Sequence, residues 1–430
     1  MIFVAFVELS TRETERNISN WVTSVFEEWS ISNRDVIAFI ADNGANMVKS
    51  GEYLTNEQDI SFFRCSTHTL QLAIKDTLKS NEYIQNCISQ SRSFVTAIHT
   101  SYILMRRYKE ICIEKNERCR KLNSDVSTRW NSTYYMLEQV MSMRKVLIQL
   151  YAENEKQLPF ESIETWDILN DVVQILAPVK ESSIFEGEKT SYISELIPTI
   201  RGLLDYLQVV FVNENNSDQN HIELKTSLGQ TFRNHLISNI QHRFKDYISL
   251  PNEIKEEINQ SIFNLNQISI PYIATALDIR YKACLELNDD ERKVVKMMLY
   301  KLIEWNTLPQ IEPILNLKNR ILNRSSSGSN QSHELSRYLS IFPIADIDPL
   351  DWWRLNSIQF PSIASLAKEI LVIVNSQASI ERIFSFSGYI LNIKRCSMST
   401  ERLSRAVKLK KNFEVVRRFQ KNQLDPSRRI

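Results

Sequence analysis

The first 80 residues alternate between short continuous apolar runs and segments with helical spacing. The runs at 2–9, 36–41 and 60–65 predict buried strands, and the spacing at 18–29 and 67–78 predicts amphipathic helices. Because strands that alternate with helices are typical of a layered sheet, we expect an α/β first lobe over residues 1–129.

The middle of the chain has a different pattern. From about residue 130 to 315 it reads as successive amphipathic helices, for example at 136–151 and at 165–179, where the last turn meets Pro178. Residues 130–322 are therefore expected to form an all-helical insertion. The stretch 323–332 is rich in Ser and Asn, which predicts a flexible linker.

Two further helices are expected in the last part, residues 333–430. The first begins at Pro361, a residue suited to the first turn, and carries an apolar stripe from Ile363 to Val374. The second opens at Ser399 or Thr400, which are both favourable N-caps.

Composition narrows the class of protein. The 430 residues contain 43% hydrophobic and 24% charged residues, which is typical of a globular protein with more than one core. No apolar run is long enough to span a membrane, and the six cysteines are too scattered for a disulfide framework. The net charge is +1, yet residues 394–429 hold twelve Lys and Arg against three acidic residues, so 12 − 3 gives +9. That charge indicates either a solvated helix face or a contact region for DNA or nuclear import.

Four short motifs follow one another along the chain. They are Asp42 at a strand end in ADNGAN, Cys65 with His68 in CSTH, Arg129 with Trp130 in STRWNST, and Glu381 in SIERIF. Together they resemble the hAT family of cut-and-paste DNA transposases. Residues 277–282, LDIRYK, also resemble a family segment that usually reads LDPRYK, with Ile279 in place of proline.

The resemblance implies an RNase H-like lobe that lacks its early strands, is interrupted by the helical insertion and is completed by a C-terminal hAT dimerisation region. It identifies Asp42 and Glu381 as the second Asp and the Glu of a DDE set, which would hold Mg²⁺ or Mn²⁺. The first Asp has no counterpart, so we expect an incomplete catalytic set. Without the family, Asp42 is a turn residue after a strand and Glu381 an ordinary helical glutamate.

The resemblance also implies contacts with nucleic acid. Cys65 and His68 match a pair that lies beside the active site and handles the DNA strand; alternatives are a structural role or half of a zinc site. Arg129 is suited to binding a phosphate, and Trp130 is suited to stacking on an extruded base. The sequence is equally compatible with Trp130 as a core residue. The expected nucleic-acid residues are Arg129, Trp130, Cys65, His68, Arg382, Lys394 and Arg395.

Self-association is expected through large apolar side chains of the C-terminal region. The expected dimerisation residues are Trp352, Trp353, Leu366, Ile370, Leu371, Ile383 and Phe384. Part of this surface must instead cover the first lobe, because Glu381 reaches Asp42 only if the region docks there.

The sequence therefore predicts a nuclear, homodimeric, nucleic-acid-associated protein derived from a hAT transposase, without transposase activity and with no membrane or small-molecule partner. One alternative is a fragment of an active DDE transposase that uses two divalent metals. The other is a protein-interaction scaffold without affinity for DNA.

Overall fold

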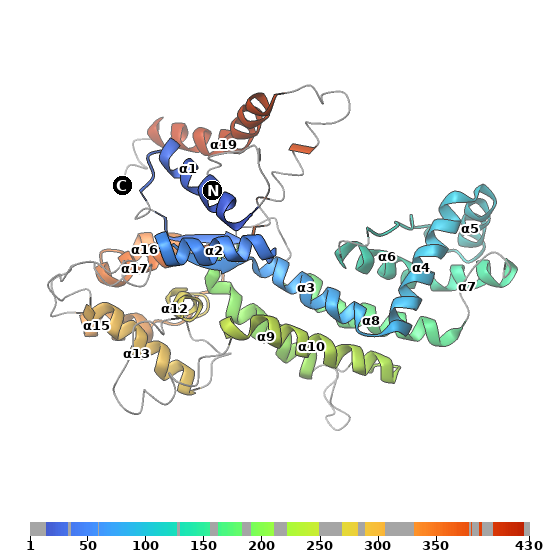
Figure 1. Ribbon diagram of the computed structural model, residues 1–430. Helices are drawn as coiled ribbons and strands as arrows, with labels where there is room; N and C mark the ends of the chain where they lie inside the picture. Colours follow the sequence, from blue (N-terminus) through green and yellow to red (C-terminus); the bar gives the residue numbers. More distant parts are fainter. Residues whose placement is uncertain are drawn as a thin grey trace.

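A computed structural model describes residues 14–32, 36–58, 60–126, 130–154, 162–182, 191–209, 222–248, 269–282, 289–305, 331–377, 380, 387–388 and 399–424. The described part is mostly helical, and its elements form three groups (Figure 1). One group surrounds a small sheet near the N-terminus, the second is a long helical arm, and the third is a helical cluster beside the sheet. No described helix is both long and apolar enough to cross a membrane.

The sheet consists of β1 (Ala38–Ala41) and β2 (Ser61–Arg64), which run parallel with Ala38 opposite Ser61 and Ala41 opposite Arg64. Helix α2 (Ala45–Gln58) joins the two strands. It packs closely on β2 because residue 51 is glycine: a Cβ there would collide with the ring of Phe62. The strands expected at 36–41 and 60–65 are thus confirmed, while an RNase H-like lobe is not.

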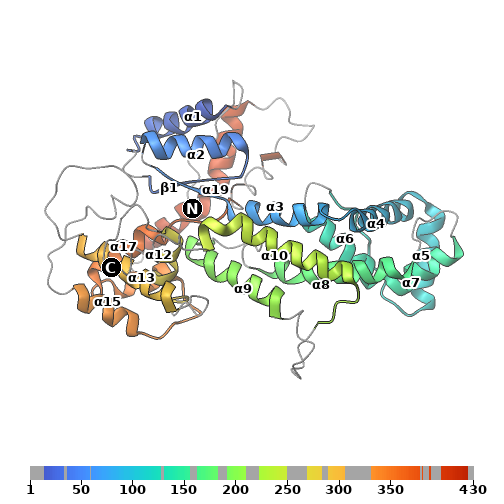
Figure 2. The same cartoon turned by 60° about the horizontal axis from the view of Figure 1, so that its bottom comes forward.

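Helices from early and late parts of the chain flank this unit. Helix α1 (Glu15–Glu28) packs on α2, and α3 (Ser66–Lys79) begins directly after β2. Helix α19 (Thr400–Leu424) lies beside α1 in both views (Figures 1 and 2), and its Lys408 stands over the ring of Trp29. The helices expected at 18–29, 67–78 and from 399 or 400 are present, whereas the strand expected at 2–9 lies outside the described residues.

The helical arm extends away from the sheet (Figure 2). Its remaining helices are α4 (Glu82–Thr100), α5 (Tyr102–Glu114), α6 (Trp130–Ser142), α7 (Arg144–Glu153), α8 (Ile163–Glu181), α9 (Leu196–Val209) and α10 (Ser227–Ile248). Helix α10 runs along α3, and α4 contacts both α5 and α6, so helical packing is continuous across residue 130.

Two details of the arm differ from the helices expected at 136–151 and 165–179. The segment 136–151 is divided between α6 and α7 at Met143, whereas α8 continues through Pro178 to Glu181. The fully buried Asp171 of α8 accepts hydrogen bonds from the backbone N–H groups of Lys225 and Thr226, at 3.0 and 2.9 Å. These bonds lie just before the start of α10 and hold it against α8.

The third group is built around aromatic side chains. Its elements are the 3₁₀ turn η2 (Ile193–Glu195) and helices α12 (Ile270–Leu277), α13 (Asp289–Trp305), α15 (Gln331–Ser340), α16 (Pro349–Asn356) and α17 (Pro361–Ile370). Tyr338, Trp352, Trp353 and Phe360 contact one another, with ring centroids between 4.8 and 6.3 Å apart. The indole N–H of Trp353 donates to the carbonyl of Leu277 at 2.8 Å, so this buried polar atom is satisfied.

The LDIRYK segment connects this cluster to η2 through a buried ion-pair network. Asp278 is fully buried and accepts from the hydroxyl of Ser194 at 2.7 Å. Arg280 lies 2.7 Å from Asp278 and 2.8 Å from Glu195. Burial raises the pKa of Glu195, and the nearby Arg280 opposes that rise. The arginine therefore compensates two carboxylates in a place from which water is largely excluded.

We predict that Arg280→Ala lowers the free energy of unfolding by about 3–5 kcal/mol, because it leaves the buried Asp278 carboxylate without its cation. Urea unfolding measures the change. The matched control is Arg354→Ala, which removes an ion pair to Asp351 whose side chains are both 63% exposed. The control is expected to cost less than about 1 kcal/mol. Equal losses in the two variants would contradict this role of the LDIRYK network.

Candidate active site at the carboxyl edge of the sheet

Asp42 follows the last residue of β1, at the edge where parallel strands of α/β proteins carry their functional groups. Its Oδ1 accepts a 2.8 Å hydrogen bond from the N–H of Gly44, which fixes the carboxylate over the turn into α2. The next residue, Asn43, donates from Nδ2 to the hydroxyl of Thr69 at 2.9 Å. Its buried Oδ1 has no hydrogen-bond partner in the described part of the chain. The side chains of Asp42 and Asn43 are thus each fixed by a hydrogen bond at this edge.

Cys65 and His68 lie at the corresponding end of β2. The backbone N–H of Cys65 donates to the carbonyl of Ala41 at 2.7 Å, and Cys65 is the N-cap of α3. Its side chain is buried, whereas His68 in the first turn of α3 is half-buried. Cys65 therefore lies close to the residue that precedes Asp42.

A metal ion needs several ligands from this edge. Among the residues that the structure describes, no group of three or more His, Cys, Asp and Glu side chains is close enough to hold one. The described residues of the edge, Asp42 included, therefore do not form a metal site on their own.

Residues 373–377, here termed the docking segment, reach this edge from the C-terminal region. The N–H and hydroxyl of Ser66 both donate to the carbonyl of Asn375, at 2.8 and 2.7 Å. Gln377 donates from its backbone N–H to the Cys65 sulfur at 3.3 Å and from Nε2 to the carbonyl of Ile40 at 2.7 Å. The docking segment thus lies across the ends of both strands.

The other side of the docking segment pairs with residues that precede α9. Tyr192 and Val374 form an antiparallel bridge, and the N–H of Asn375 donates to the carbonyl of Ser191 at 3.0 Å. The Asn375 amide accepts from the Ser191 hydroxyl and donates to the Tyr192 carbonyl. Sequence reasoning missed Asn375 and its neighbours, because their partners lie more than 180 residues away.

Several expected site residues cannot be placed. Glu381 comes four residues after Gln377 but lies outside the described residues, as do Arg129, Arg382, Lys394, Arg395, Ile383 and Phe384.

Two family models match the chain. The ZBED1 RNase-like helical domain matches residues 63–175, and the hAT family C-terminal dimerisation region matches residues 334–413. The resemblance to the hAT family is thus confirmed in these two regions. The docking segment lies inside the second match and binds residues of the first, so the two regions are parts of one folded unit.

Curated relatives agree with this assignment. The chain is 19% identical to zinc finger BED domain-containing protein 4 of Homo sapiens over 95% of its length, covering 33% of that protein. It is 23% identical to zinc finger BED domain-containing protein RICESLEEPER 3 of Oryza sativa subsp. japonica, with coverage of 93% and 55%. It is 20% identical to the Hobo transposase of Drosophila melanogaster, with coverage of 87% and 59%. The chain thus spans between one third and three fifths of the length of these relatives.

Trp130 occupies the first position of α6 and is only 5% exposed. Its ring meets that of Tyr134 edge-on, with centroids 6.4 Å apart, inside the main hydrophobic core. In this conformation Trp130 has the core position that the sequence offered as an alternative, and its indole is not available to stack on a base.

The expected dimerisation residues also lie inward. Trp352, Trp353, Leu366, Ile370 and Leu371 are each at most 5% exposed and belong to the core of the same chain. Their large apolar side chains stabilise the fold of the dimerisation region, so in this fold they offer almost no surface to a second chain.

We predict that Asn375→Ala lowers the free energy of unfolding by about 1–3 kcal/mol, because it removes two side-chain hydrogen bonds, one from the Ser191 hydroxyl and one to the Tyr192 carbonyl. The Cys65 thiol, covered by the docking segment, should become more reactive toward iodoacetamide, as measured by peptide mass spectrometry. Asn123→Ala is the control, since Asn123 is exposed. A variant as stable as the control, with Cys65 still protected, would show that the docking segment is not held by this amide.

Proposed function

We propose that this chain is the folded portion of a hAT transposase-derived nuclear protein that associates with itself and binds DNA. The observation that carries the proposal is the docking of residues 373–377 across the strand ends beside Asp42. It joins the dimerisation region to the edge that family members use for DNA chemistry. Nuclear residence accords with relatives named as transposases and BED zinc-finger proteins.

The DNA-binding part of the proposal is supported by charge. Helix α19 carries eight Lys and Arg against two Glu, and Arg402, Lys410 and Arg417 are exposed along it. Such a surface neutralises phosphates without reading bases. We therefore propose binding that tolerates any sequence.

We also propose that residues 1–430 alone do not cut DNA. The family resemblance assigns two carboxylates of this chain, Asp42 and Glu381, to a site that uses three. Docking supports a common location for the pair, because Gln377 contacts Ile40 two residues before Asp42 and precedes Glu381 by four residues. Two carboxylates hold a divalent metal less firmly than three.

We predict that a labelled random-sequence duplex loses about 100-fold in affinity between roughly 50 and 200 mM salt, which corresponds to about four phosphate contacts. Fluorescence anisotropy measures binding, and the DNA recovered after incubation with Mg²⁺ should be intact. A second duplex of unrelated sequence is the control and should bind equally well.

Both the binding measurement and the test of DNA integrity can contradict the proposal. Absence of binding at the lower salt concentration would favour the scaffold alternative. Cleaved DNA whose appearance is abolished by Asp42→Ala would favour the active transposase.

The self-associating part of the proposal uses outer side chains of the dimerisation region. Phe342, Ile344, Leu355 and Ile358 are large apolar residues that are 86%, 42%, 68% and 94% exposed. They belong to the 17-residue stretch from 342 to 358 around α16, whose inner face is filled by Trp352 and Trp353. An exposed apolar stretch on a folded core is typical of a protein interface.

We predict that Ile358→Asp weakens self-association at least tenfold while leaving folding intact, because a charge there would be buried at the interface. Analytical ultracentrifugation of the variant and the original chain gives the dissociation constants. Ile113→Asp on α5, at a residue 80% exposed, is the matched control and should not change association. An original chain that stays monomeric at micromolar concentration would overturn the dimer.

A further inference from the structure

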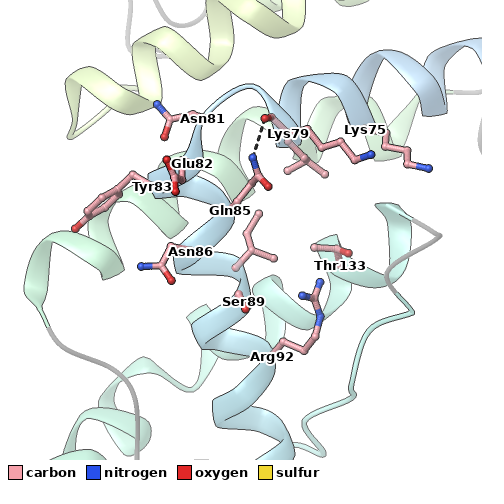
Figure 3. A pocket seen from close by; sticks show the side chains of 12 residues that line it. Lys75, Lys79, Asn81, Glu82, Tyr83, Gln85, Asn86, Ser89, Arg92 and Thr133 are labelled. Atoms are coloured by element: carbon pink, nitrogen blue, oxygen red, sulfur yellow. Dashed lines mark hydrogen bonds between the residues drawn. The ribbon is translucent and has the colours of Figure 1, made fainter.

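A cavity of about 1010 Å³ opens between α3, α4 and the start of α6. Figure 3 shows side chains from both sides of the bend between α3 and α4 lining it. Lys75 and Lys79 enter from α3, Gln85, Asn86 and Arg92 from α4, and Thr133 from α6. Of the sequence motifs, STRWNST reaches this place through its last residue, Thr133.

The lining of the cavity is mixed, and its charged side chains favour an anion. Lys75 and Lys79 are exposed, and neither ammonium group forms an ion pair with a residue that the structure describes. Glu82 is the one acidic side chain in the lining. Side-chain amides such as Gln85 and Asn86 add hydrogen-bond donors.

The far wall is rigid. Arg92 donates to both carboxylate oxygens of Asp125, at 2.6 and 2.7 Å, and Thr133 donates to the same carboxylate at 2.8 Å. Burial alone would raise the pKa of Asp125, but the bonds from Arg92 and Thr133 hold it below its ordinary value. Arg92 is therefore already neutralised, and the two lysines supply the uncompensated positive charge.

Helix α3 connects the cavity to the candidate site. It begins at Cys65 on the strand edge and ends at Lys79, which is about 20 Å at 1.5 Å per residue. His68, Lys75 and Lys79 are separated by seven and four residues, so they lie along one face of α3. Helix α10 covers a different face, where Asp76 pairs with Arg243 and Thr77 accepts from Asn239. On the lysine face, the described part of the chain leaves Lys75 and Lys79 exposed and His68 half-buried.

We infer that this face of α3 and the cavity at its end form a track for the phosphodiester backbone of DNA, with Lys75 and Lys79 on successive phosphates. The inference rests on the proposed DNA binding and names its path. A strand that enters at the Asp42 edge and follows α3 over about 20 Å spans about six nucleotides at the duplex rise of 3.4 Å. A cavity with two uncompensated lysines at its rim fits a phosphodiester backbone better than a small apolar ligand.

The test is the double variant Lys75→Gln/Lys79→Gln, assayed by anisotropy with the same labelled duplex across a salt series. Loss of two phosphate contacts should lower the affinity about tenfold at 0.1 M salt and make the slope of log K against log salt shallower by about 2. The matched control is Lys109→Gln/Lys115→Gln, which removes two exposed lysines at α5. The control should bind as the original chain does, and unchanged thermal unfolding should accompany both variants.

Acetylation of lysines with and without duplex provides a second measurement on the unmodified chain. Lys75 and Lys79 should be protected by DNA, whereas Lys109 should react equally in both samples. Inorganic phosphate in millimolar excess should not displace the duplex, since a free anion occupies one contact and a backbone occupies several. Displacement by phosphate would show a simple anion site and overturn the track.

The outcomes separate this inference from the proposed function. If the original chain binds no duplex, the proposed DNA binding itself fails. If it binds, but the α3 variant matches the α5 control and Lys75 and Lys79 remain reactive, DNA lies elsewhere and the track alone is refuted.

Discussion

The structure depends on the docking of residues 373–377 between two partners that are distant in sequence. On one side their backbone pairs with residues 191–193. On the other side Ser66 donates hydrogen bonds to the carbonyl of Asn375, and the Cys65 sulfur accepts one from the N–H of Gln377. Closing loops of about 180 and 310 residues costs conformational entropy that grows only with the logarithm of loop length. A short segment with several hydrogen bonds can therefore hold three distant parts of this long chain together.

The buried network around Arg280 supports this docking from the side of the aromatic cluster. Arg280 compensates Glu195, which lies in the 3₁₀ turn directly after the residues that pair with the docking segment. The adjacent Lys282 is buried, burial lowers its pKa to about 8, and its ammonium group donates to the carbonyl of Tyr338. The LDIRYK motif therefore acts structurally in this chain: it fixes the turn that receives the C-terminal region, and Ile279 is accommodated there fully buried.

Local patterns predicted the parts of the fold that depend on neighbours in sequence. The strands at 38–41 and 61–64 and helices α1, α3 and α19 follow the apolar spacing closely. Helix α17 begins at Pro361 as expected but ends at Ile370, and Val374 of the expected stripe pairs with Tyr192 instead. The position of Asp42 at a strand end was likewise visible, since an apolar run that stops at Asp-Asn-Gly indicates a strand followed by a turn. The docking segment could not be found in this way, because its bonding partners are set by the tertiary fold. For the same reason, the pattern identified Trp130, Trp352 and Trp353 as large anchors but not the side on which they would be buried. The cavity at α3 and α4 arises from the bend between two helices, which no periodicity records.

The arrangement separates two roles within the dimerisation region. Its inner residues, among them Trp353 and Asn375, bind the same chain, and its outer residues, such as Leu355 and Ile358, face solvent. Truncating the region would remove both sets, so it would unfold the strand edge at the same time as it abolished any interface. A substitution on the outer face acts on association alone, whereas one on the inner face reaches Cys65 and the neighbourhood of Asp42 through direct hydrogen bonds. The residues proposed for self-association and the residues that hold the edge beside Asp42 are therefore different sets within one region of the chain.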